Sequence, residues 1–253
     1  MMDIFDLMGG NMNKTGCIDL LEEVSEHLEA MRSSGEIKVV KVKSILEHLR
    51  SCLEYFANDT YKIITTQKTA RLNVYFPYKY PQKINDFFTK VLKVAPGEFA
   101  SLFDLITSIQ DYHSGDNWLV MMCNLTNDAK HRQPIPLDSQ EVIKKTAVSV
   151  GNLKLFDILG PTKNVTIDIG RVRSNGMVVH GLKWKDGNLT TQNTNHQNAV
   201  NICITRKNEI RFHGHDYEVI PFLDKCLNHL KEFIPKAYAI LDELSRALPK
   251  SLT

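Results

Sequence analysis

The run NLTNDAKHR, residues 124–132, combines the side chain types that phosphodiester chemistry uses. On a helix, Asn124, Asp128 and His131 lie at i, i+4 and i+7 and therefore share one face. A neutral imidazole can take a proton near neutral pH, and a carboxylate can orient it. Lys130 and Arg132 can hold a phosphate. The run predicts a site that binds or cleaves a phosphodiester. The alternative is a solvated helix face whose basic end offsets the helix dipole.

A second charged pair lies in LEHLRSCLEYF, residues 46–56. Arg50 and Glu54 are four residues apart, beside the apolar side of the predicted helix, where they can meet a partner helix. If Arg50 faces His131, the two side chains can grip one phosphate. The alternative is a helix-surface ion pair worth roughly 0.3–0.5 kcal/mol, which indicates no function.

Two further pairs have suggestive spacing. Arg173 and His180 are separated as in an R-x6-H motif, but a Ser-Asn-Gly turn lies between them, so we interpret them as part of a hairpin. His213 and His215 can face the same side of a strand and chelate zinc. No third or fourth ligand is evident, so a strand end or hairpin is the favoured interpretation. The polar stretch 193–198 is typical of a loop, which can also contact a partner.

Composition excludes several classes of protein. The 253 residues include 31 basic and 29 acidic ones, and a net charge of +2 provides no global attraction to nucleic acid or membranes. The five cysteines include no C-x-x-C pair, which argues against a disulfide framework and a thiolate zinc site. The chain has no P-loop, no G-x-G-x-x-G motif, no G-x-S-x-G motif and no H-E-x-x-H motif. We therefore expect no cofactor and no metal.

The N-terminal segment, residues 1–14, has acidic residues where a secretory signal carries lysines. We expect a loose tail there rather than a targeting segment. No apolar run approaches the roughly 18 residues of a membrane-spanning helix. These features predict a cytoplasmic protein with no membrane partner.

Apolar residues recur every three or four positions through most of the first half of the chain. This spacing predicts amphipathic helices at 18–31 and 38–59, which form an antiparallel pair, and further helices at 85–94, 99–109 and 116–132. The last of these carries the run NLTNDAKHR and ends before Pro134. Between the second and third helices we expect an extended connector, because Pro81 should keep the following residues out of a helix.

After residue 137 the sequence becomes rich in β-branched residues bounded by Gly, Asn or Asp, which predicts antiparallel strands at 144–150, 164–172, 176–184, 198–206 and 209–214. Helical spacing returns from 222 to 248, with Pro235 marking a kink or a boundary. We therefore predict an α+β fold: a flexible tail (1–14), a helical region (15–137), a β-rich region (138–220) and a C-terminal helix that packs on the bundle (221–253).

Four segments resemble a group of uncharacterised bacterial proteins. LRSCLEY resembles the group's L-R-S-x-L-D-H signature, and FPYK, SIQDYHSG and NLTNDAKHR resemble its F-P-I, l-Q-P-Y-h-G and L-n-x-x-D-K-H-R segments. Order and spacing agree across residues 38–137. The paired long helices look similar to the HEPN superfamily (higher eukaryote and prokaryote nucleotide-binding domains). Its active members are often metal-independent ribonucleases or toxins with an R-x(4–6)-H motif at a dimer interface.

This resemblance implies a HEPN-like helical bundle, a homodimer and an RNA or nucleotide ligand. It assigns the motif arginine to Arg50 and places Tyr55 where the motif has histidine. Tyrosine has an ordinary pKa near 10 and is a poor general base at neutral pH, so His131 would have to supply the imidazole. We therefore expect a catalytic set of Arg50, Asp128 and His131, and substrate binding by Glu54, Tyr55, Asn124, Lys130 and Arg132.

The leading hypothesis is a bacterial HEPN-like protein that binds RNA or a nucleotide and can cleave RNA without a metal, in antiviral defence or as a toxin. The alternative is a non-catalytic dimerisation or partner-binding module of a larger defence complex. A third hypothesis is a metal-dependent hydrolase built around His213 and His215. A pocket shared by Arg50 and His131 would favour the first hypothesis. A buried, ion-paired Arg50 with His131 remote on the surface would favour the second.

Overall fold

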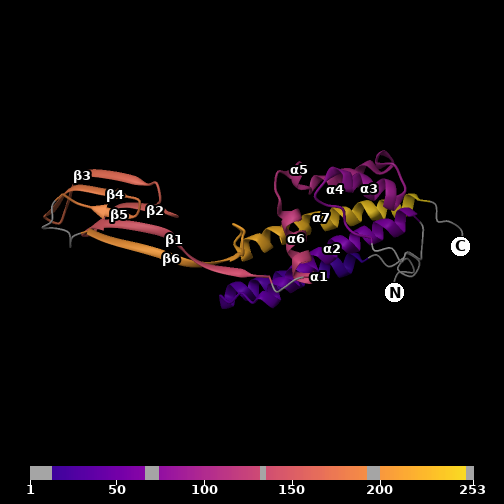
Figure 1. The fold of residues 1–253 in the computed structure, drawn as a ribbon, viewed down its shortest axis with the longest axis horizontal. Coiled ribbons are helices and arrows are strands. Elements are labelled where there is room, and N and C mark those ends of the chain that lie inside the picture. Colours follow the sequence, from indigo (N-terminus) through magenta and orange to yellow (C-terminus); the bar gives the residue numbers. More distant parts are fainter. Residues whose placement is uncertain (1–12, 66–73, 132–134, 193–199, 249–253) are drawn as a thin grey trace, which may run out of the picture. The chain divides into compact units, whose positions relative to one another are not determined.

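The computed structural model describes residues 13–65, 74–131, 135–192 and 200–248. Residues 1–137 and 212–253 form one compact unit, and residues 138–211 form the other. The first unit is helical and the second is built of strands (Figure 1). The chain is therefore α+β, as the sequence predicts. None of the helices within the described ranges is long and apolar enough to cross a membrane.

Two long helices, α1 (Lys14–Ser34) and α2 (Val39–Thr65), pack against each other along the helical unit. Gly35 ends α1 with a φ of 69°, and its N–H donates to the Met31 carbonyl at 3.0 Å. This left-handed conformation costs a glycine little, because glycine has no Cβ. The buried residues of α1 recur every three or four positions, as expected: Cys17, Leu21, Val24, Leu28 and Met31.

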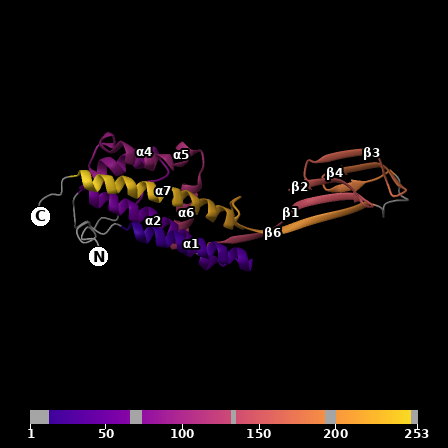
Figure 2. The same cartoon turned by 180° about the vertical axis from the view of Figure 1, so that it is seen from behind.

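The C-terminal helix α7 (Val219–Ala247) packs on both α1 and α2, and Figure 2 shows it alongside them from behind. Tyr238 on α7 donates a hydrogen bond to the Asp59 carboxylate on α2 at 3.0 Å, and both side chains are buried. Pro235 lies inside a single helix, so it marks no boundary. The buried neighbours Ile234 and Ala237 hold the helix against the core despite the missing proline N–H.

Several short helical segments connect α2 to α6. They are α3 (Pro81–Asp86), the π-helix η2 (Phe87–Leu92), the 3-10 helix η3 (Pro96–Phe99), α4 (Ala100–Ser108) and α5 (Asp111–Ser114). The expectation that Pro81 prevents a helix is wrong, because Pro81 occupies the first helical turn. There a proline lacks only an N–H that has no partner within the helix.

Helix α6 (Trp118–His131) carries the run NLTNDAKHR and contacts both α2 and α7. Its buried side follows the predicted apolar stripe, Trp118, Met122, Leu125 and Ala129. The opposite, polar side therefore faces outward, and Asn124, Asn127, Asp128 and Lys130 are exposed.

Within its described residues, the second unit contains two three-stranded sheets. One has the strand order β2-β1-β6 and comprises β1 (Leu137–Val150), β2 (Leu153–Leu159) and β6 (Val200–Phe212). The other has the order β3-β4-β5 and comprises β3 (Thr166–Ser174), β4 (Met177–Lys185) and β5 (Asn188–Thr190). The unit has its own core, in which Val148, Val150, Val179, Leu182 and Trp184 are buried.

Two features of these sheets differ from the sequence prediction. The predicted strands 198–206 and 209–214 form one strand, β6, because polar residues within it pair across to β1. Arg206 contacts Glu141 at 3.6 Å, and Glu209 forms an ion pair with Lys144. Strands β2 and β5 were not predicted, although β2 pairs with β1 and β5 pairs with β4 in antiparallel register.

Candidate functional site

Arg50 lies on α2 with only 6% of its surface exposed. Its Nη2 contacts Glu54 Oε1 at 2.5 Å, and its Nη1 donates to the Cys123 sulfur on α6. The guanidinium carbon also lies 4.8 Å from the centre of the Tyr78 ring. Carboxylate, thiol and aromatic ring together enclose the guanidinium. An enclosed and paired arginine is poorly placed to bind a phosphate directly.

Glu54 ties this ion pair to the backbone of the connector that follows α2. Its Oε2 accepts a hydrogen bond from the Phe76 N–H at 2.8 Å. Burial raises the pKa of the Glu54 carboxyl, and the positive charge of Arg50, the Phe76 N–H and the charge of Lys130 oppose that rise. The pair therefore connects α2 to residues 74–78, and Lys130 on α6 acts electrostatically on the same carboxyl.

Residues 76–78 join all four segments that carry the resemblance. Gln110, which is fully buried, donates to the Pro77 carbonyl at 3.2 Å and to the Ile106 carbonyl at 3.1 Å. Asn127 on α6 donates to the Tyr78 hydroxyl at 3.1 Å. Glu54 of LRSCLEY, Gln110 of SIQDYHSG and Asn127 of NLTNDAKHR thus all bind the FPYK segment. These motif residues have a structural role in positioning α6.

Sequence reasoning missed Tyr78, Gln110 and Cys123 as parts of this arrangement. Tyr78 and Gln110 belong to the segments FPYK and SIQDYHSG, and their place in these motifs was the signal that could have identified them. The sequence gave no signal for Cys123, because a cysteine on an apolar helix face is typical of a hydrophobic core. Burial raises the pKa of the Cys123 thiol to about 12, although the Arg50 charge opposes the rise. The thiol is therefore neutral at physiological pH.

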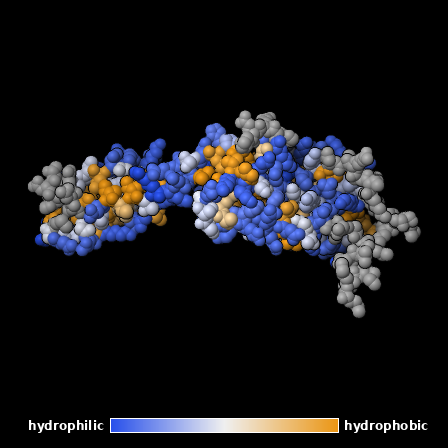
Figure 3. Space-filling view, turned by 90° about the horizontal axis from the view of Figure 1, so that it is seen from below, coloured by the Kyte–Doolittle hydropathy of each residue, from blue (hydrophilic) through white to orange (hydrophobic). Residues whose placement is uncertain are grey.

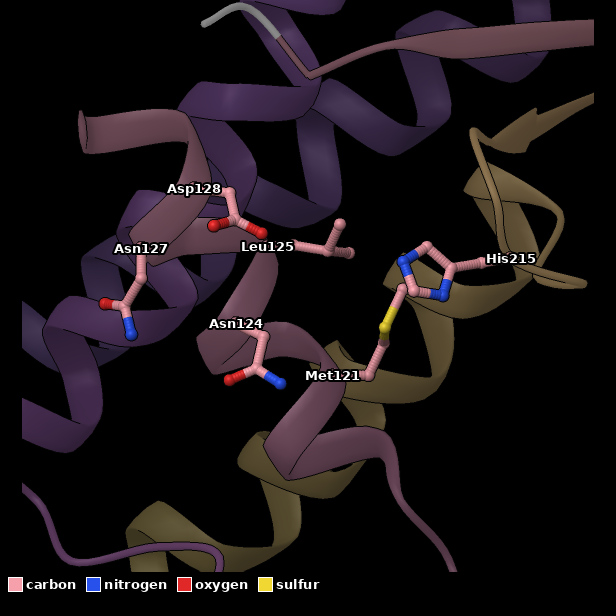
Figure 4. A pocket seen from close by; sticks show the side chains of 6 residues that line it. All are labelled: Met121, Asn124, Leu125, Asn127, Asp128 and His215. Atoms are coloured by element: carbon pink, nitrogen blue, oxygen red, sulfur yellow. The ribbon is translucent and has the colours of Figure 1, made fainter. Parts of the chain in front are cut away.

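A pocket of about 300 Å³ lies on the exposed side of α6 (Figure 4). It is lined by Met121, Asn124, Leu125, Asn127, Asp128 and His215. His215 comes from the turn between β6 and α7, within the same compact unit as α6. Two of the expected site residues, Asn124 and Asp128, therefore line the same pocket as His215, a residue of the metal-site hypothesis.

The remaining predicted site residues fall in three groups. Tyr55 is 38% exposed on α2, next to the half-buried Glu54. Lys130 is exposed near the end of α6. His131 is the last residue of α6 and its side chain, like all of Arg132, lies outside the described residues. The structure thus brings Arg50 to Glu54 and Asn124 to the same pocket as Asp128, while a shared pocket for Arg50 and His131 stays a prediction.

Of the other candidate pairs, Arg173 and His180 belong to the second unit, whereas His213 and His215 lie in the turn after β6, in the helical unit. Arg173 and His180 lie on the antiparallel strands β3 and β4, where His180 is paired with Arg171, so the hairpin interpretation is confirmed. In the part of the chain that the structure describes, no group of three His, Cys, Asp or Glu side chains is arranged to hold a metal ion. The polar stretch 193–198 lies outside the described residues.

Comparisons of the chain with family models, with curated proteins and with solved structures returned no match. The likeness to HEPN proteins therefore rests on the four motif segments and the paired helices.

Proposed function

We propose that the helical unit binds RNA or a nucleotide on the exposed side of α6. The observation that carries this proposal is the pocket beside Asn124 and Asp128. No described residue forms a hydrogen bond or an ion pair with the side chains of Asn124, Asp128 or His215, so these groups are available to a ligand. Lys130 is exposed and lies three residues beyond Asn127, which lines the pocket, so it can attract a phosphate at that edge.

In this proposal the bundle of α1, α2, α6 and α7 is HEPN-like, and the protein acts as a homodimer. The two paired long helices and the linked motif segments support the assignment. Arg50 and Glu54 then act as positioning residues that hold α6 and residues 74–78 on α2. The burial of Arg50 and its ion pair with Glu54 support that role over direct phosphate contact.

Metal-independent RNA cleavage, in bacterial defence or as a toxin, stays a prediction. Cleavage needs a base, which Tyr55 does not supply at neutral pH, and a cation that stabilises the strained phosphate. The enclosure of Arg50 favours binding without cleavage, because this cation already has a carboxylate, a thiol and an aromatic ring as partners.

The second candidate function is partner binding within a larger defence complex. Large apolar side chains are exposed in the strand unit, among them Leu159 at 80%, Ile202 at 42% and Ile204 at 40%. Figure 3 shows hydrophobic residues gathered on one face of this unit. Exposed apolar groups of this kind favour contact with another protein.

Fluorescence anisotropy with a labelled single-stranded RNA tests the first function. We expect wild-type protein to bind, with an affinity that falls as salt rises, and the Asn124→Ala/Lys130→Ala variant to bind about tenfold more weakly. Lys83→Ala, which removes an exposed lysine from α3, is the matched control and should bind like wild type. No binding by wild type, or equal binding by the α6 variant, would reject the proposal.

A further inference from the structure

The α6 pocket has an apolar floor beneath a polar rim. Met121 and Leu125 stand one turn apart on α6 and are each 7% exposed. A flat aromatic ring can gain contact with a thioether and a leucine, whereas a phosphate would exchange water for an apolar surface. The carboxylate of Asp128 on the rim further disfavours an anion. The pocket itself therefore suits an uncharged, polar ring.

The rim offers hydrogen-bonding groups that match the edge of a nucleobase. Asn124 and Asp128 are four residues apart, so they lie on the same side of α6. An amide both donates and accepts, as in the paired contacts that asparagine makes with adenine, and a carboxylate accepts from an exocyclic amino group. Uracil places two carbonyls around its single N–H, and these would face the carboxylate unfavourably.

His215 completes the pocket from the turn after β6. Gly214 has a φ of 72°, and the backbone N–H groups of His213 and His215 donate to Pro136 and Phe212, each at 3.0 Å. These contacts fix the turn, and Figure 4 shows the His215 ring reaching toward Met121 and Leu125. An imidazole in this position can stack on a base, as aromatic side chains do in single-strand binding proteins.

We infer that this pocket seats the base of the bound nucleotide or RNA, with His215 stacking on it, Met121 and Leu125 beneath it, and Asn124 and Asp128 reading an amino-bearing edge. The inference rests on the proposed function and specifies which part of the ligand the protein recognises. The phosphate stays outside the pocket, where the exposed Lys130 attracts it. The specificity of binding then comes from contacts with the base, and the salt dependence of the affinity comes from the phosphate.

Isothermal titration with four probes tests this arrangement: adenosine, AMP, uridine and ribose 5-phosphate. We expect adenosine and AMP to bind, uridine to bind about tenfold more weakly, and ribose 5-phosphate to give no heat. His215→Ala should weaken the binding of adenosine about tenfold. His215→Phe should keep the wild-type affinity, because phenylalanine preserves a stacking ring. His113→Ala, which removes an exposed histidine on α5, is the control.

Asp128→Asn supplies a second readout that does not depend on stacking. The amide has nearly the same shape but mixes donor and acceptor, so the preference for adenosine over uridine should shrink. Equal binding of AMP and ribose 5-phosphate, or an unchanged affinity for adenosine in His215→Ala, would contradict the binding of the base in this pocket while leaving nucleotide binding intact. If neither the four probes nor labelled RNA bind, the proposed function itself fails.

Discussion

The guanidinium of Arg50 lies 4.8 Å from the centre of the Tyr78 ring, and the hydroxyl of the same tyrosine accepts a hydrogen bond from Asn127. A buried charge on α2 is thereby connected to a residue that lines the α6 pocket. Arg50, which the resemblance assigns to catalysis, thus helps to position Asn127 at the pocket through Tyr78.

Breaking the ion pair between the buried Arg50 and the half-buried Glu54 should strongly destabilise the helical unit. Glu54→Gln leaves the enclosed guanidinium without its carboxylate, so we expect a loss of about 3–5 kcal/mol in the free energy of unfolding, measured by urea denaturation. Lys90→Met, which breaks the exposed i,i+4 pair between Lys90 and Asp86, should change it by less than about 1 kcal/mol. Equal effects of the two variants would show that the Arg50 pair has no special structural role.

Tyr78 offers separate tests of its ring and its hydroxyl. Tyr78→Phe keeps the ring near Arg50 and removes the acceptor for Asn127, so it should cost about 0.5–1.5 kcal/mol in the free energy of unfolding. Tyr78→Leu also removes the cation–π contact and should cost about 0.5–2 kcal/mol more. Thermal and urea unfolding measure both. A smaller loss for the leucine variant than for the phenylalanine variant would rule out the stacking role.

Restoring the motif histidine tests the catalytic hypothesis. Because Arg50 is enclosed, we expect neither wild type nor Tyr55→His to cleave RNA in the presence of a chelator. Cleavage is measured by gel electrophoresis and by the cyclic phosphate ends that a metal-free reaction leaves. Activity of wild type that is lost in His131→Ala would instead establish the endoribonuclease.

Thiol labelling reports on the packing of α6 against α2. Cys123 is buried with its pKa raised to about 12, whereas Cys203 on β6 is exposed. At pH 8 an alkylating reagent should therefore modify Cys203 and leave Cys123 unmodified until the protein is unfolded. Mass spectrometry of the digested protein gives the result. Rapid labelling of Cys123 in the folded protein would mean that Arg50 is more accessible than described.

The homodimer can be checked by sedimentation velocity. We expect a species with twice the 28.8 kDa mass of one chain at micromolar concentration. A monomer at all concentrations would remove the dimer from the proposal without affecting the α6 pocket.

Much of the fold follows from residue spacing. The long helices are predictable because their buried residues recur over many turns, as in Leu21, Leu28 and Leu49. Strand β6 is not predictable as one strand, because its polar centre around Lys207 resembles a break between two strands. Only the ion pairs with β1 show that the strand continues. Local pattern also misread Pro81, which fits either a connector or a first helical turn.

The candidate site was only partly predictable. Asn124 and Asp128 share a helix, so their common face follows from the 3.6-residue period. Asp128 and His215 are 87 positions apart, and their presence in one pocket depends on how α6 and α7 pack, which no local pattern specifies. The burial of Arg50 likewise depends on Tyr78 and Cys123, from two other segments.

Hydrogen exchange with and without saturating AMP tests the central claim most directly, because it locates the ligand on the chain. We predict slower exchange in the part of α6 around residues 121–128 and in the turn around His215, with the strands of residues 138–211 unchanged. Slower exchange confined to those strands, or no change anywhere under conditions where the nucleotide is bound, would contradict it.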